Sequence, residues 1–146
     1  MVGRIYKAGE CIEYKKGVLS NYPVLKLKLY NMLGREFYEE LEVPVDTGFE
    51  GSLMLESDDY KFFIVGELPK EYWSTYSTLT GSILMRVASA FAVIGNIKLK
   101  IYVETPYLGR GKRLLGREVL NKLVLVLDGI KSRCYVAKYI NWCNKC

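Results

Sequence analysis

Asp46-Thr47-Gly48 is the short stretch of this sequence whose residue types could most readily perform chemistry. It places an ionisable carboxyl group, a small hydroxyl and a glycine at the end of an alternating apolar run, Leu41 to Val45. A second apolar run, Ser52 to Leu55, follows. Asp and Gly are common in turns, so one interpretation is a simple turn between two strands. The other is a carboxylate held at the floor of a cleft.

The absence of histidine narrows the chemistry more than any other feature of the composition. It excludes Ser-His and Cys-His nucleophile systems, and it excludes every metal site that needs a histidine ligand. Any acid–base chemistry must therefore use carboxylates, tyrosine, lysine or cysteine.

The overall composition favours a sheet-rich globular protein of one domain. The chain has 146 residues, and 50% of them are apolar, which is enough for a substantial core. The net charge of +5 is spread along the chain, so we expect neither a nucleic-acid nor a membrane partner. The loop Gly109–Arg113 is the best candidate for phosphate binding, but a solvated loop explains it better. No apolar run is long enough for a signal peptide or a membrane span, so we expect a soluble, cytoplasmic protein.

The four cysteines leave several interpretations open. Cys143 and Cys146 have the spacing of a metal-binding or redox pair, but the chain lacks a second such pair. A zinc site that combines them with Cys11 and Cys134 is possible. Buried free thiols, or a disulfide that fixes the C-terminal tail, are simpler alternatives. We therefore expect no metal and no cofactor.

The segments that must position Asp46 have the patterns of β-strands. Val24–Tyr30 alternates apolar residues with lysine, which predicts a half-buried strand. After a turn at residues 31–34, residues 36–46 predict the second arm of a hairpin that delivers Asp46 to its end. The apolar face of this arm would hold Phe37, Leu41, Val43 and Val45, and the opposite face Glu36, Glu40 and Glu42.

The remaining segments complete an all-β pattern with one or two short helices. Further strands are expected within residues 77–103, interrupted at Gly81 and at residues 95–96. Residues 57–66 predict a short helix with the Ser57 hydroxyl as its N-cap. Residues 114–123 predict a second helical stretch. The run of residues 123–127 predicts a strand buried on both faces, followed by a tight turn.

Asp46-Thr47-Gly48 has a counterpart about 70 residues further on, the segment "LLGREVL" from Leu114 to Leu120. The two motifs together resemble those of the retroviral-type (retropepsin-like) aspartic proteases and their cellular and archaeal relatives. In that family a hydrophobic strand ends in Asp-Thr-Gly or Asp-Ser-Gly, and a glycine-bearing hairpin, the flap, follows. A hydrophobic-hydrophobic-Gly-Arg motif then begins a short helix. The resemblance covers roughly Val24 to Val136.

The resemblance implies an all-β acid-protease fold: a closed barrel with one or two short helices and one half-site per chain. Residues 1–146 would form a single domain with a core of about residues 24–136. Residues 1–23 would add an N-terminal strand extension, and residues 137–146 a cysteine-containing tail. Because the chain has one Asp-Thr-Gly and the chemistry needs two carboxylates, two copies would meet about a two-fold axis, each contributing Asp46.

The resemblance also implies roles for the neighbours of Asp46. Thr47 would hydrogen-bond to the backbone of its counterpart, and Gly48 would leave room for the main chain of a substrate. Phe49 and Glu50 would complete the active-site loop.

Further implied roles concern the support of this loop and its cover. Glu50 would form an ion pair with Arg117, which follows Gly116 in the second motif, because the planar guanidinium can make two parallel hydrogen bonds to a carboxylate. Thr80, Gly81 and Ser82 would form the tip of a flap that closes over the peptide. The glycine-rich tip of the viral enzymes is missing here.

Two hypotheses of different classes follow. The first is a homodimeric aspartic endopeptidase that cuts extended, largely apolar segments of peptides or unfolded proteins at mildly acidic pH. The second is a dimeric module of the same fold that binds a peptide or protein without cutting it. The first is favoured because Thr47, Gly48 and Arg117 are all retained beside Asp46.

Overall fold

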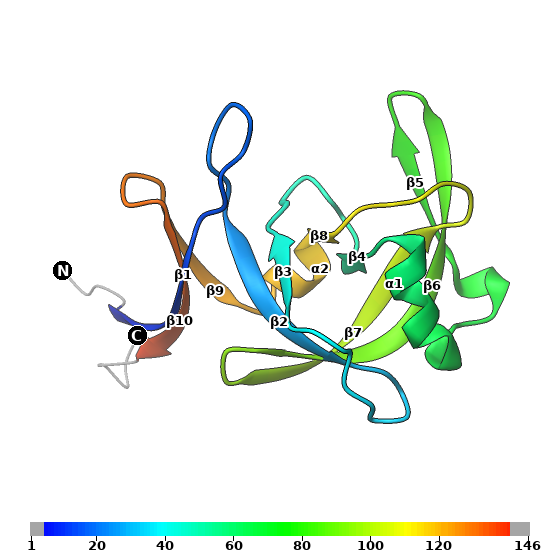
Figure 1. Ribbon diagram of the computed structural model, residues 1–146, viewed down its shortest axis with the longest axis horizontal. Coiled ribbons are helices and arrows are strands. Elements are labelled where there is room, and N and C mark those ends of the chain that lie inside the picture. Colours follow the sequence, from blue (N-terminus) through cyan, green and yellow to red (C-terminus); the bar gives the residue numbers. More distant parts are fainter. Residues whose placement is uncertain (1–4, 141–146) are drawn as a thin grey trace, which may run out of the picture.

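The computed structural model describes residues 5–140 and consists mainly of β-strands (Figure 1). The larger sheet has seven strands in the order β3-β2-β6-β7-β4-β8, and β5 pairs with β6 outside this path. The bounds are β2 Val24–Tyr30, β3 Leu41–Pro44, β4 Leu53–Met54, β5 Ser74–Thr78, β6 Gly81–Ile94, β7 Ile97–Pro106 and β8 Leu114–Leu115.

The predicted hairpin before Asp46 is confirmed. Strand β2 has the predicted bounds and pairs antiparallel with β3, with Leu25 opposite Val43. Strand β3 is shorter than predicted, because residues 36–40 form a loop in which only Glu36 bridges back to β2. The predicted faces are nevertheless correct: Phe37, Leu41 and Val43 are buried, and Glu36 and Glu40 are exposed.

The two ends of the larger sheet meet immediately before Asp46. Val45, which follows β3, forms a parallel bridge with Leu115 of β8, and the Asp46 N–H donates to the Leu115 carbonyl at 3.0 Å. Strands β3 and β8 stand at opposite ends of the strand order, so the sheet curls back on itself around the core. Its fully buried side chains include Leu25, Leu27, Leu29, Leu41, Leu53, Leu55, Tyr60, Phe63, Ile94 and Leu115.

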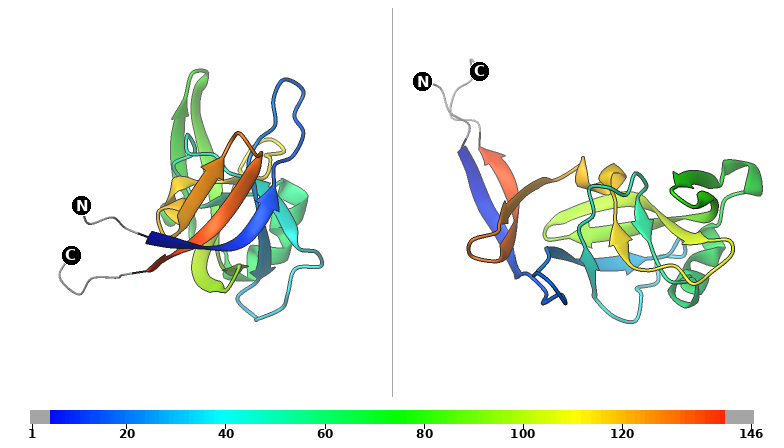
Figure 2. Two further views of the ribbon diagram at one scale, coloured as in Figure 1. Left: turned by 90° about the vertical axis from the view of Figure 1, so that its left-hand side faces the viewer. Right: turned by 90° about the horizontal axis from the view of Figure 1, so that it is seen from above.

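A separate three-stranded sheet stands at one end of the molecule (Figures 1 and 2). It contains β1 Ile5–Glu13, β10 Arg133–Ile140 and β9 Val124–Asp128, in that order. The prediction that residues 123–127 are buried on both faces is wrong. Strand β9 is the edge of this small sheet, and Val126 and Leu127, whose side chains point to opposite faces, are both exposed, so neither face is covered there.

The two described cysteines lie in this small sheet, and both are free thiols. Cys11 of β1 is exposed, whereas Cys134 of β10 is buried. Burial raises the pKa of the Cys134 thiol to about 11. The predictions about Cys143 and Cys146 fall outside the described residues.

The helical segments are short. They comprise α1 Ser57–Tyr60, the 3₁₀ turns η1 Lys61–Gly66 and η2 Lys70–Tyr72, and α2 Arg117–Leu120. The predicted Ser57 cap is wrong: Glu56 is the N-cap residue, because its carbonyl accepts the first hydrogen bond of the helix, from the Tyr60 N–H. The Glu56 side chain makes no capping bond. Within residues 5–140, no helix is long and apolar enough to cross a membrane.

Candidate active site

The loop from Asp46 to Ser52, here the Asp46 loop, lies where the sheet closes and is bound to the second motif by backbone hydrogen bonds. The Gly116 N–H donates to the Ser52 carbonyl at 2.7 Å, and the Arg117 N–H donates to the Phe49 carbonyl at 2.8 Å. The Glu118 N–H donates to the Gly51 carbonyl at 3.1 Å. Two segments far apart in the sequence therefore form one rigid platform.

Two positions of this platform require glycine because neighbouring atoms leave no room for a Cβ atom. A Cβ atom on Gly116 would lie 2.2 Å from the carbonyl oxygen of Gly51. Gly116 has φ −95° and ψ 176°, a conformation open to any residue, so space alone explains the glycine. A Cβ atom on Gly51 would lie 2.3 Å from Oε2 of Glu104. Both glycines therefore allow the close packing that fixes the Asp46 loop.

The carboxylate of Asp46 is partly exposed and held in one orientation. Its Oδ1 accepts a hydrogen bond from the Gly48 N–H at 2.9 Å, and no described residue donates a hydrogen bond to Oδ2. A Cβ atom on Gly48 would lie 3.1 Å from Oδ1, so a larger residue would crowd the carboxylate. Asp46 is thus anchored through one oxygen while the other remains available to a ligand.

A cleft of about 580 Å³ separates the Asp46 loop from the β5–β6 hairpin, which rises beside it in Figure 1. The loop forms one wall and the two arms of the hairpin form the other, with Leu114 and Arg117 contributed by the second motif. The lining residues are Asp46, Gly48, Phe49, Glu50, Met54, Thr75, Tyr76, Ser77, Thr78, Ile83, Met85, Leu114 and Arg117.

The hairpin has the predicted tip, but its first arm begins earlier than expected. Thr78 pairs with Gly81 at the turn, and Gly81 has φ +126°, which favours glycine. The first arm starts at Ser74, three residues before the range 77–103 in which strands were expected. Thr80, Gly81 and Ser82 are exposed at the tip and do not line the cleft, which the arms line instead.

The expected ion pair between Glu50 and Arg117 is not formed in the described structure. Both side chains are exposed and both line the cleft. Arg117 instead supports the loop through its backbone N–H, as described above. Both charged groups are therefore available to a ligand in the cleft.

The sequence did not point to Glu104, which lies behind the Asp46 loop. Its carboxylate accepts hydrogen bonds from the Ser52 N–H at 2.8 Å and from the Tyr76 hydroxyl at 2.5 Å. Burial raises the pKa of Glu104 and Glu118 adds to the increase, whereas hydrogen bonds from Tyr76, Ser52 and Ser74 oppose it. A single acid within the run of residues 101–105 was the available signal.

The raised pKa of Glu104 predicts a specific pH dependence of stability. The folded state favours the protonated form, so this group's contribution to the free energy of unfolding increases as pH falls through the folded pKa toward the ordinary glutamate value of about 4.3. Glu104→Gln cannot titrate and should lack this component. Urea unfolding of both proteins across a pH series measures it; parallel curves would contradict the assignment.

Comparison with known proteins identifies the fold of this chain. No family model and no curated protein matches the sequence. Among solved structures, a retropepsin-like aspartic protease from Rickettsia conorii has a TM-score of 0.56 and 14% identity, over 97% of this chain and 98% of that chain. The EIAV protease, solved with the inhibitor HBY-793, has a TM-score of 0.51 and 16% identity, over 74% and 93%. The chain has the retropepsin-like fold.

Other charged groups of this retropepsin-like chain lie outside the cleft. In the loop Gly109–Arg113, the candidate for phosphate binding, Arg110 pairs with Glu56 at 3.1 Å. Arg113 of the same loop pairs with Glu39 and Asp59. These contacts engage both arginines with acidic partners.

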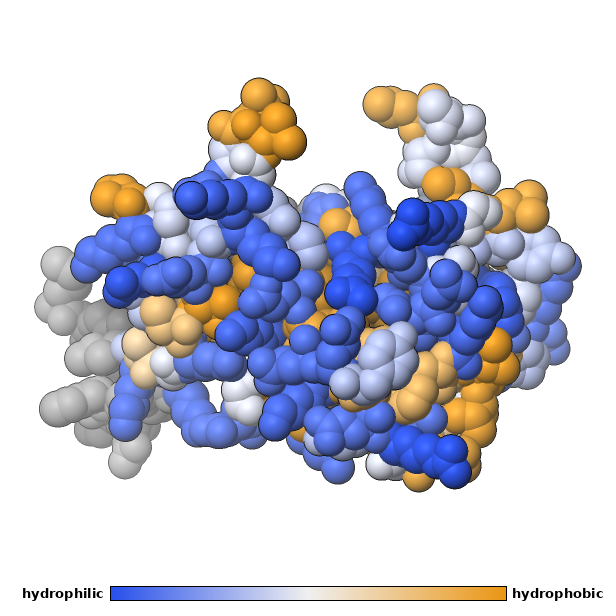
Figure 3. All heavy atoms as spheres, viewed as in Figure 1, coloured by the Kyte–Doolittle hydropathy of each residue, from blue (hydrophilic) through white to orange (hydrophobic). Residues whose placement is uncertain are grey.

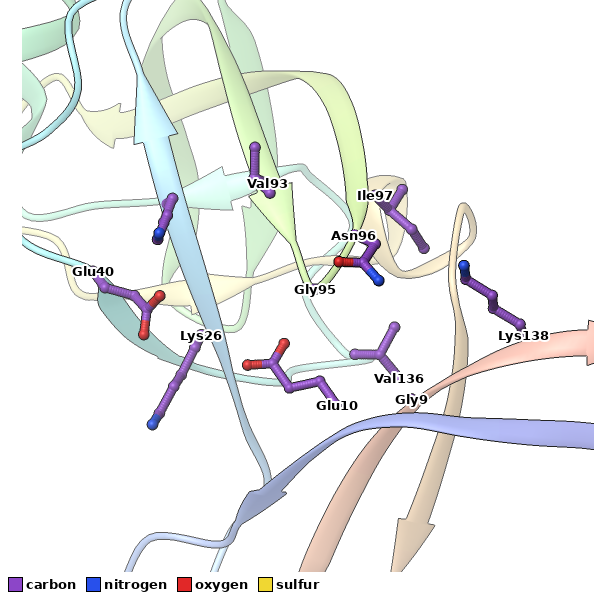
Figure 4. Close-up of a pocket in the computed structure, with 11 residues that line it drawn as sticks. Gly9, Glu10, Lys26, Glu40, Val93, Gly95, Asn96, Ile97, Val136 and Lys138 are labelled. Carbon is purple, nitrogen blue, oxygen red and sulfur yellow. The ribbon is translucent and has the colours of Figure 1, made fainter.

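A second cavity, of about 390 Å³, lies between the small sheet and the β2 and β6–β7 strands (Figure 4). Glu10, Glu40, Lys26 and Lys138 are among its lining residues, and none of the predicted site residues is. Within residues 5–140, no group of three or more acidic or cysteine side chains is arranged to hold a metal ion.

Proposed function

We propose that two copies of this chain form an aspartic endopeptidase that hydrolyses peptide bonds in peptides or unfolded proteins. The observation that carries the proposal is the partly exposed carboxylate of Asp46, anchored through one oxygen beside a cleft in a retropepsin-like fold. We also propose that residues 1–146 act as one domain in the cytoplasm.

The chemistry needs two copies of Asp46. One carboxylate takes a proton from a water molecule, whose oxygen attacks the peptide carbonyl carbon, while the other carboxyl group donates a proton to the carbonyl oxygen. Transfer of a proton to the amide nitrogen then accompanies breakage of the carbon–nitrogen bond. Two carboxylates about 3 Å apart share one proton because both cannot ionise, as is known for aspartic proteases as a class.

The distribution of exposed apolar residues supports a dimer. Val18, Leu19 and Leu79 have relative exposures of 103%, 99% and 108%, respectively. They lie in the β1–β2 loop and at the tip of the β5–β6 hairpin, which project from the same side of the molecule as the Asp46 loop (Figures 1 and 3). Exposed apolar side chains on the two projections that flank a half-site fit contact with a second copy.

The neighbouring residues have roles in this proposal. Thr47 joins the two Asp46 loops across the two-fold axis, and Gly48 admits the main chain of the peptide. Phe49 contributes an apolar wall beside Tyr76, with ring centroids 5.5 Å apart. Glu50 and Arg117 are free to contact polar groups of the bound peptide. The hairpin tip of Thr80, Gly81 and Ser82 closes over it.

The proposal predicts that proteolysis depends on protein concentration. Digestion of casein should rise with the square of concentration where the chain is monomeric and linearly where it is dimeric, because only the dimer has both carboxylates. Sedimentation equilibrium at the same concentrations locates the transition. Casein cleavage by a strict monomer would exclude the mechanism. Dimers that bind casein without cutting it at any pH would favour the non-catalytic binding module.

A further inference from the structure

Glu104 of β7 joins the two walls of the cleft through one buried carboxylate. The residue is only 2% exposed. Its Oε2 accepts a hydrogen bond from the backbone N–H of Ser52, the last residue of the Asp46 loop, at 2.8 Å. Its Oε1 accepts one from the hydroxyl of Tyr76, in the first arm of the hairpin, at 2.5 Å. Loop and hairpin are therefore bonded to the same side chain.

The loop and the hairpin pack closely against each other around this carboxylate. A Cβ atom on Gly51 would lie 2.3 Å from Oε2 of Glu104 and 2.4 Å from the Tyr76 oxygen. The ring of Tyr76 also contacts the ring of Phe49, and both residues line the cleft. A change in the position of Tyr76 would therefore alter the width of the cleft directly.

Strand β5 needs such an attachment because its backbone pairing is one-sided. Among the described strands, β5 pairs only with β6, and it lies outside the main path of the sheet. The bond between Tyr76 and Glu104 ties this edge strand to the centre of the sheet and to the Asp46 loop. Breaking a buried hydrogen bond leaves a polar group without a partner, which is costly, so the tie is substantial.

We propose that Glu104 is a positioning residue for peptide binding, which holds β5 at a fixed distance from the Asp46 loop through the hydroxyl of Tyr76. This role rests on the proposed peptidase function. A cleft that is already ordered spares the peptide the entropy loss of ordering β5. Loss of the tie should weaken peptide binding and leave the chemical step intact, because neither residue contacts Asp46 in the hydrogen bonds described above.

Tyr76→Phe tests the proposal because it removes one hydroxyl and keeps the ring. We expect KM for fluorescein-labelled casein to rise about tenfold, with kcat changed less than twofold. Tyr38→Phe is the matched control: its hydroxyl also donates to a carboxylate, that of Asp59 at 3.3 Å, and it does not line the cleft. We expect both kinetic constants to be unchanged in this control.

A second variant and an activity-independent readout complete the test. Glu104→Gln retains an oxygen that can accept from Ser52 and an amide that can donate to Tyr76, so its KM should rise less. Hydrogen exchange of amides 74–78, measured in an Asp46→Asn background, should accelerate with Tyr76→Phe and not with Tyr38→Phe. Unchanged exchange, or faster exchange with unchanged KM, would overturn the positioning role. Because exchange needs no catalysis, failure of the peptidase proposal remains distinguishable.

Discussion

Asp46→Asn should reduce casein cleavage by at least roughly 10³-fold without unfolding the protein. The amide is isosteric and its oxygen can still accept the hydrogen bond from the Gly48 N–H, so the loop geometry should survive. What is lost is the proton-sharing pair, because asparagine can neither take a proton from water nor donate one to a carbonyl oxygen. Initial rates with labelled casein measure the loss of cleavage, and the thermal unfolding midpoint measures whether the protein stays folded.

A control variant and a mixing experiment sharpen this prediction. Asp58→Asn removes an exposed carboxylate that pairs with Lys61, and it should leave the rate unchanged. Adding a fourfold excess of the Asp46→Asn chain to fixed wild-type protein, under conditions that favour dimers, should lower activity to about one fifth, because subunits exchange at random between partners. Undiminished activity in the mixture, or cleavage by pure Asp46→Asn, would falsify the shared site.

Gly116→Ala should destabilise the fold by about 3 kcal/mol and lower Tm by roughly 10 °C, with a matching loss of activity. The added methyl carbon would lie 2.2 Å from the Gly51 carbonyl oxygen and 2.8 Å from its carbonyl carbon. These are backbone atoms fixed by the hydrogen bonds between the Asp46 loop and the second motif, so they cannot rotate away as a flexible side chain would. Thermal unfolding followed by circular dichroism measures the change.

Gly129→Ala is the matched control for this substitution. A Cβ atom there would meet nothing within 4 Å, and Gly129 is not among the glycines with positive φ. Alanine should therefore leave Tm unchanged or raise it slightly, since it restricts the unfolded chain. If Gly116→Ala behaved like this control, the close packing of the loop on the second motif would not be a source of stability.

The elements around Asp46 were largely predictable because their information is local. Alternation of lysine and apolar residues placed β2 correctly, and the glutamates of residues 36–42 identified the outer face of the following arm. The Gly81 tip was likewise visible as a break in a strand pattern. In contrast, the predicted Ser57 cap and the predicted burial of β9 failed. The cap depends on the residue at which the helix begins, and the burial of β9 depends on which segments cover its faces.

The pairing of charged side chains was less accessible to sequence. Glu50 and Arg117 were expected to form an ion pair, yet the described structure has none between them, and both are exposed residues that line the cleft. Arg110 and Arg113, which look like a free basic loop, are paired with acids that lie more than fifty residues away along the chain. Long side chains reach several partners at similar distances, so the fold decides among them.

The sequence alone determined that Asp46 follows a buried strand and that a second motif, which contains Gly116, lies about 70 residues further on. Both features could be predicted because strand periodicity and the positions of glycines can be seen directly in the residue types. Only the tertiary structure decided that Glu104 belongs to the site. Alternation along β7 puts Glu104 on the same face as Lys98 and Lys100, which predicts solvent exposure. Its end of the strand lies between β4 and β6 and is covered by Tyr76 of β5. Periodicity assigns a side chain to a face, and whether water or another strand covers that face depends on segments far away in the chain.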